Sequence, residues 1–171
     1  RTGDEPLALA MAGRTMEHHP QDRRGWEALW AVYAPAKRWG ELADRLGELS
    51  KAHPDSALAF HYAGFAAASA LRWDDALARL DRAWELDRKN AAARLEAARI
   101  RLVHRKDRDR ASSDARDVLT ADPSNRSASD LLSFVAQRRS EDGDHAGSIR
   151  EIEAIIAARP DDVVALSNPG V

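Results

Sequence analysis

The sequence contains no cysteine among its 171 residues. This absence excludes a disulfide scaffold, a thiol nucleophile, cysteine-ligated zinc and iron–sulfur clusters. It assigns no compartment, because cysteine-free chains occur in both the cytoplasm and the periplasm. Localisation, cytoplasmic or periplasmic, therefore stays undecided by the sequence.

An excess of positive charge is also missing. Lys and Arg number 26 against 28 Asp and Glu, which gives a formal net charge of −2. Proteins that bind nucleic acid or anionic membranes need surplus cations, so the sequence predicts no specific nucleic-acid partner. The uncharged run 56–71 has only 16 residues and includes His61 and Ser69. A membrane span needs about 20 apolar residues, so no span is predicted.

Signatures of catalysis are absent as well. The sequence has no glycine-rich phosphate loop, no nucleophile elbow and no HExxH spacing among its six histidines. Adjacent carboxylates such as Asp74 and Asp75 fall at an expected helix start, where their negative charge interacts favourably with the helix dipole. We therefore expect no enzyme activity, no cofactor and no metal site.

One segment partly matches a calcium-binding loop. Asp142, Asp144, Gly147 and Glu153 stand at loop positions one, three, six and twelve. Ala146, however, occupies the fifth position, where a ligand oxygen is needed. The segment is better explained as an acidic turn in which Asp144 caps the following helix.

The residues that are abundant indicate helices. Hydrophobic residues make up 44% and charged residues 32% of the chain, as in an ordinary folded domain. β-branched residues rarely alternate, whereas Ala, Leu, Arg and Glu recur at spacings of three and four. This periodicity predicts an all-α protein.

The helices repeat at a fixed period. Pro20, Pro54, Arg88, Pro123 and Pro160 follow amphipathic segments at separations of 34, 34, 35 and 37 residues. Twelve residues before each stands an anchor of the second helix of a unit, and sixteen before that an apolar first-helix residue. The anchors are Ala8, Leu42, Ala76, Ala111 and Ser148, and the first-helix residues are Trp26, Phe60, Leu95 and Leu132. In this register the extra residues of the longer units fall between repeats.

This pattern resembles the tetratricopeptide-repeat family, most clearly in 57–90, which contains AFHYAGF followed by Ala76. The resemblance implies a right-handed superhelical solenoid of antiparallel helix pairs, in which Gly64 and Ala76 lie where two helices approach closely. Trp30 replaces a small residue of the pattern and implies a splayed pair, and Arg99 and Arg139 are further departures. The predicted array is a half repeat at 4–20, repeats at 23–56, 57–90, 92–125 and 129–162, and a further helix or tail at 163–171.

Helix-capping residues are predicted at the starts of several helices. They are Asp55, Ser124 and Asp161 before first helices, and Asp74 and Asp144 before second helices. Because the chain begins with a lone second helix and no Met, we expect a piece of a longer array. Ends without polar caps also predict end-to-end self-association.

The family resemblance implies a concave groove, lined by first helices, that receives a peptide or helix of another protein. In the sequence register the groove residues are Glu27, His61, Phe65, Glu96, Ile100 and Gln137. Phe65 has an alternative place against the neighbouring repeat. Most other aromatic residues, including Trp26, Tyr33, Phe60, Trp39 and Trp73, are assigned to the core. The groove is apolar to mildly acidic, which favours a neutral or basic hydrophobic ligand.

A basic cluster marks the turn between the helices of the third repeat. Its members are Arg101, Arg105, Lys106 and Arg108, diluted by Asp107 and Asp109. One interpretation is a solvated turn that faces the acidic turn at 141–144. The other is a docking patch for an acidic peptide, polyanion or headgroup.

The predicted function is thus a non-catalytic protein–protein interaction scaffold. Alternatives are a module of a bacterial envelope polysaccharide-export or secretion assembly, a substrate-recognition arm of a larger enzyme, and self-assembly by stacking of the repeats.

Overall fold

The structure is a computed structural model that describes residues 4–158. This part of the chain contains α-helices and no strand, which confirms the all-α prediction. The helices belong to two compact units, residues 1–93 and residues from 94 onward, with the boundary near the start of the sixth helix. The helices are α1 (Asp4–His18), α2 (Arg23–Tyr33), α3 (Trp39–Ala52), α4 (Ala57–Ser69), α5 (Trp73–Leu86), α6 (Ala91–His104), α7 (Arg108–Ala121), α8 (Arg126–Glu141) and α9 (His145–Ala158).

The same turn begins each first helix, α2, α4, α6 and α8. Its last residue is Asp22, Ser56, Asn90 or Asn125, whose backbone N–H donates to the carbonyl three residues earlier at 2.9 to 3.1 Å. The side chain of this residue then accepts a hydrogen bond from a backbone N–H in the first turn of the helix. These four residues are therefore the N-caps. We count positions along each first helix from its N-cap, which is position zero.

Two of the predicted caps are wrong by one residue. Asp55 and Ser124 follow a proline as expected, but each lies inside the turn, and the next residue is the cap. Asp144 caps α9 as predicted, with its carboxylate 2.8 Å from a backbone nitrogen. Asp74 lies inside α5 rather than before it. The predicted cap Asp161 and the helix beginning there fall outside the described residues.

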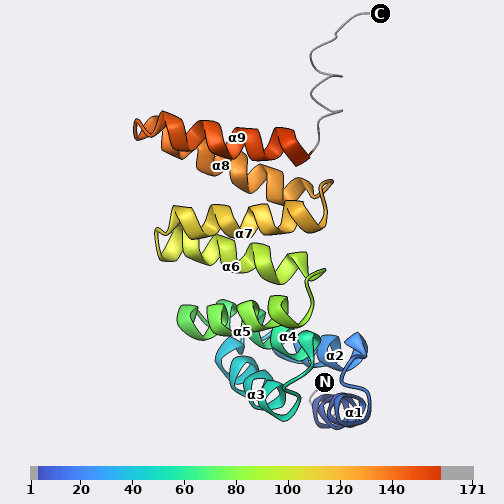
Figure 1. Ribbon diagram of the computed structural model, residues 1–171. Helices are drawn as coiled ribbons and strands as arrows, with labels where there is room; N and C mark the ends of the chain where they lie inside the picture. Colours follow the sequence, from blue (N-terminus) through green and yellow to red (C-terminus); the bar gives the residue numbers. More distant parts are fainter. Residues whose placement is uncertain (1–3, 159–171) are drawn as a thin grey trace, which may run out of the picture. The chain divides into compact units, whose positions relative to one another are not determined.

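In the first unit, α4 and α5 pack as a close antiparallel pair (Figure 1). A methyl group added to Gly64 would lie 2.7 Å from Cγ and 3.2 Å from the backbone nitrogen of Leu80. Leu80 is fully buried, and so is Ala76 one turn before it. The expected close approach is therefore present, since Gly64 leaves no room for a side chain.

The pair α2 and α3 contains larger side chains. Trp26 and Leu29 are fully buried in the core, whereas the ring of Trp30 lies 5.6 Å from that of Trp39. The ring of Trp30 thus takes a place where the repeat pattern has a small residue. It is only partly buried, and it remains available to line a surface.

Buried ion pairs join helices within the second unit. The buried guanidinium of Arg101 hydrogen-bonds the buried carboxylate of Asp114, joining α6 to α7. Arg139, predicted as a departure from an apolar position, reaches Asp144 at 2.7 Å, and its Nε lies 3.4 Å from the buried Glu151. Buried charges persist only when they are paired, so each of these residues depends on its partner.

The cap positions correct the register of the second unit. From cap to second-helix anchor there are 20 residues in the first two repeats, but 21 from Asn90 to Ala111 and 23 from Asn125 to Ser148. From anchor to the next cap the count is constant at 14. The prediction that extra residues fall between repeats is therefore wrong. They lie within the helix pair itself, because the first helices α6 and α8 have 14 and 16 residues against 13 in α4, whereas the turn that follows is the same length in these three pairs.

Candidate functional site

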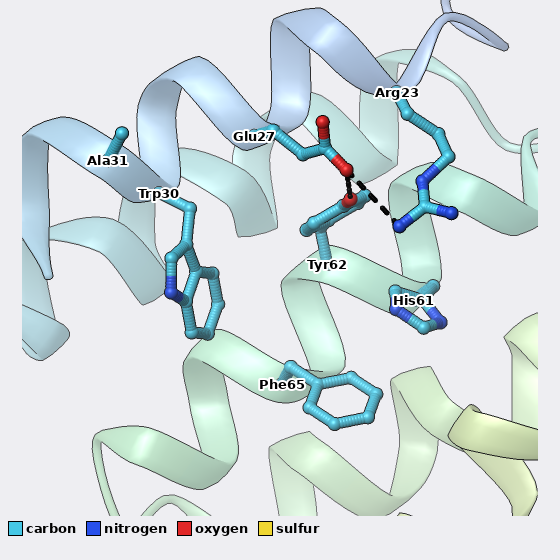
Figure 2. Close-up of a pocket in the computed structure, with 7 residues that line it drawn as sticks. All are labelled: Arg23, Glu27, Trp30, Ala31, His61, Tyr62 and Phe65. Atoms are coloured by element: carbon cyan, nitrogen blue, oxygen red, sulfur yellow. Dashed lines mark hydrogen bonds and ion pairs between the residues drawn. The ribbon is translucent and has the colours of Figure 1, made fainter.

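Counting from the caps shows which first-helix residues share a face. The fifth and ninth positions are Glu27 and Ala31 in α2, and His61 and Phe65 in α4. In the first unit these four residues lie together around a pocket of about 300 Å³, the α2–α4 pocket (Figure 2). Its lining consists of Arg23, Glu27, Trp30, Ala31, His61, Tyr62 and Phe65.

Aromatic rings form most of the pocket wall. Trp30 extends from α2, and Tyr62 and Phe65 extend from α4 (Figure 2). The ring of Tyr62 is stacked on buried Trp26 with centroids 6.2 Å apart and planes inclined by 7°. The wall is thus fixed to the core and presents a preformed apolar surface to a ligand.

One edge of the pocket is polar. Arg23 pairs with Glu27 at 3.1 Å, and the hydroxyl of Tyr62 donates to the same carboxylate oxygen at 3.3 Å. Burial raises the pKa of Tyr62, so the hydroxyl stays protonated and remains a donor. More than half of each side chain of the Arg23–Glu27 pair is exposed, and such a pair contributes at most about 1 kcal/mol. A ligand cation can therefore compete for Glu27.

Asn90, the N-cap of α6, determines which ring nitrogen of His61 carries the proton. Nδ1 of His61 lies 3.0 Å from Oδ1 of Asn90, the oxygen that also accepts the backbone N–H of Ala93. Because that oxygen can only accept, Nδ1 must donate. Burial lowers the pKa of His61 below its usual 6.5, and the hydrogen bond to Asn90 opposes this only in part. At neutral pH the ring is uncharged, and Nε2 is left as an acceptor.

The predicted groove residues divide between the two units. Glu27, His61 and Phe65 lie together in the α2–α4 pocket, where Phe65 contacts the ring of His61 at 4.7 Å. Ile100 is only 2% exposed, so its assignment as an accessible anchor is wrong. Glu96 pairs with Arg99 on its own helix, and exposed Gln137 bonds Glu141.

The corrected register explains this division. In the second unit the fifth and ninth positions are Leu95 and Arg99 in α6, and Asp130 and Phe134 in α8. These four residues line a hollow of about 330 Å³ together with Ser127 and Leu131. Sequence reasoning missed them because it counted back from second-helix anchors, and the first helices differ in length. The capping residues Asn90 and Asn125, each two residues after the periodic residue Arg88 or Pro123, are the sequence signal that would have predicted them.

The predicted basic patch is only partly a surface. Arg101 is 4% exposed and paired with Asp114, so it is not available for docking. Arg108 pairs with Asp142, as expected for a turn that faces an acidic neighbour. Arg105 and Lys106 are exposed. Two further exposed arginines outside the predicted patch are Arg99 on α6 and Arg138 on α8.

The described residues contain neither a cluster of metal-ligating side chains nor a helix that could span a membrane. Between residues 4 and 158 no group of three or more His, Asp or Glu side chains is placed to hold a metal ion. None of the helices in that range is long and apolar enough to cross a bilayer.

Comparison with solved structures shows the fold. No family model matches the sequence, and no curated protein matches it. Among solved structures, YrrB, described as a TPR protein with an unusual peptide-binding site, has 20% identity and a TM-score of 0.62 over 97% of this chain and 84% of its own. MamA has 14% identity and a TM-score of 0.65, over 95% and 86%. TTC0263, a thermophilic TPR protein of Thermus thermophilus, has 16% identity and a TM-score of 0.55, over 95% and 87%.

Proposed function

We propose that this chain, which has the tetratricopeptide-repeat fold, is a non-catalytic scaffold that binds a peptide or helix of a partner protein in its α2–α4 pocket. The observation that carries the proposal is the aromatic wall of Trp30, Tyr62 and Phe65 beside the acceptors Glu27 and His61. A rigid apolar pocket with a few oriented polar groups is typical of a recognition site. Helices that are already packed incur little ordering cost on binding.

The pocket chemistry defines the ligand. A volume of about 300 Å³ accommodates one or two large apolar side chains of a peptide. Both Nε2 of His61 and the carboxylate of Glu27 are acceptors, so they select donors, such as a backbone N–H or a cationic side chain. The ligand is therefore a neutral or basic segment with a Leu, Met or aromatic residue at its centre.

The structural neighbours support the class of ligand. YrrB is described as having a peptide-binding site, and it shares this fold over nearly the whole chain. In our structure Trp30, which replaces a small residue of the repeat pattern, lines the pocket on the α2 side.

A peptide array tests the proposal. Peptides of about ten residues vary in the central residue and in the charge of the flanks, and the strongest binder with neutral or basic flanks is then measured in solution with the intact chain. Phe65→Ala and Trp30→Ala should each weaken that binding about tenfold, as truncation of a central aromatic anchor does. Met11→Ala removes an exposed apolar side chain of α1 away from the pocket and should leave binding unchanged. Equal affinity of all four proteins would overturn the assignment.

A further inference from the structure

The second unit has a groove of its own between α6 and α8. It consists of two hollows, of about 330 and 770 Å³, which both include Phe134 in their lining. The smaller hollow lies at Leu95, Arg99 and Asp130. The larger one extends past Val103 and Arg138 to Lys106 in the turn after α6. We call the two together the α6–α8 groove.

Phe134 stands at the centre of this groove. It is the only Phe, Trp or Tyr in residues 94–171, and its side chain is 45% exposed. The guanidinium of Arg138 lies 5.2 Å from the ring centroid and holds the ring in place. Val103, 62% exposed, adds apolar surface in the larger hollow. An exposed aromatic ring flanked by hollows is the kind of residue that anchors a partner.

The charges around Phe134 are mainly positive and only weakly engaged. Arg99 pairs with Glu96 and Arg138 with Glu141, but both arginine side chains are more than half exposed. Exposed pairs of this kind exchange readily for another carboxylate. Lys106 is exposed in the turn after α6.

Two of the acidic side chains that line the groove are already hydrogen-bonded. Asp107 caps α7 by accepting the backbone N–H of Arg110, and Asp109 bonds the guanidinium of Arg139. Asp130 is the exposed carboxylate of the smaller hollow. The groove thus offers an apolar centre with cations on both sides of it.

We infer that the α6–α8 groove is a second binding site, for an acidic peptide segment with a large apolar side chain that contacts Phe134 and Val103. Carboxylates of the segment pair with Lys106, Arg99 and Arg138. The inference uses residues of the second unit alone and is independent of the proposed α2–α4 ligand, which is neutral or basic. A peptide is favoured over a nucleic acid or a lipid headgroup because it can place separate carboxylates at Arg99, Arg138 and Lys106, away from Asp130, while an apolar side chain contacts Phe134 and Val103.

The experiment presents the intact chain with an array of peptides of about ten residues, in which the central residue is Phe, Leu or Ser and the flanks are acidic or basic. Acidic flanks with a Phe or Leu centre should bind at least about tenfold more tightly than basic flanks or a Ser centre. Raising the salt concentration from about 50 to 500 mM should weaken this binding several-fold, since exposed charge pairs are screened.

Matched variants locate the site. Phe134→Ala and Lys106→Glu should each lower the affinity about tenfold. Ile149→Ala and Arg110→Glu are comparable apolar-truncation and charge-reversal changes at exposed positions of the second unit outside the groove, and they should leave the affinity unchanged. Phe65→Ala should also leave this binding unchanged, which separates the result from a test of the α2–α4 pocket. An unchanged melting temperature of each variant shows that the fold is intact.

Three outcomes would overturn the inference. The first is an array with no preference for acidic flanks. The second is an affinity for the acidic peptide that Phe134→Ala does not change. The third is tighter binding of a short single-stranded RNA or of anionic phosphatidylserine vesicles than of any peptide, with Phe134→Ala again without effect. The third result would identify a polyanion surface instead.

Discussion

Two glycine substitutions in the first unit measure how tightly its helices pack. Gly64→Ala places a methyl group 2.7 Å from Cγ of Leu80 and 3.2 Å from its backbone nitrogen. Carbon atoms normally approach no closer than about 3.5 Å, so Leu80 or the whole of α5 must move. Leu80 is fully buried, and overpacking of a core costs about 1–3 kcal/mol. Alanine recovers about 1 kcal/mol of helix propensity, which leaves a net loss of up to about 2 kcal/mol.

Gly13→Ala is the matched control, because a methyl group there has no atom within 4 Å outside its own helix turn. It should stabilise by about 0.5–1 kcal/mol, so the two variants should differ by about 1–3 kcal/mol. Urea denaturation followed by tryptophan fluorescence measures this difference. All five tryptophans lie between residues 26 and 84 and report on the first unit. If Gly64→Ala proves as stable as Gly13→Ala, the close approach of α4 and α5 is refuted.

Three further predictions concern a pH dependence, a buried ion pair and a cap. Because burial lowers the pKa of His61 in the folded chain below the unfolded value of 6.5, the unfolded chain binds the proton more readily, and the free energy of unfolding should fall as the pH drops through 6.5. His61→Gln should make this fall smaller in denaturation curves recorded between pH 7 and 5. An identical pH dependence of the two proteins would contradict the burial of the ring. Asp114→Asn leaves the guanidinium of Arg101 buried without its carboxylate and should lower the free energy of unfolding by about 3 kcal/mol or more. Urea denaturation followed by circular dichroism measures this loss, and a change under about 1 kcal/mol would contradict the buried pair. Asn125→Ala should cost about 1 kcal/mol and Ser124→Ala much less, whereas the reverse order would restore the cap position expected from sequence.

The helices themselves were predictable from local chemistry. Prolines and capping residues between amphipathic segments mark the helix boundaries, and the apolar spacing in 57–90 gave the close approach at Gly64. Each of these signals acts over a few residues, within which the backbone conformation is set by local sterics and hydrogen bonds. The α2–α4 pocket residues Glu27, His61 and Phe65 followed from the same register.

The second unit was harder to predict because its first helices are longer and its buried ion pairs join residues on different helices. Counting back from Ala111 and Ser148 assumes first helices of constant length, but α6 and α8 are longer than α4. The shift buries Ile100 and brings Phe134 to the surface. Arg101 was read as a solvated cation because the sequence does not show that Asp114 stands opposite it. Partners on separate helices become visible only once the helices are packed.

Nuclear magnetic resonance tests the central claim, that a partner peptide binds between α2 and α4, most directly. The tightest neutral or basic peptide from the array is titrated into the isotopically labelled chain, and backbone and indole N–H shifts are followed residue by residue. We predict saturable shifts concentrated at Trp30, His61 and Phe65, with the indole N–H of Trp30 among the largest. Shifts confined to α3 and α5, with these three residues unmoved, would contradict the account.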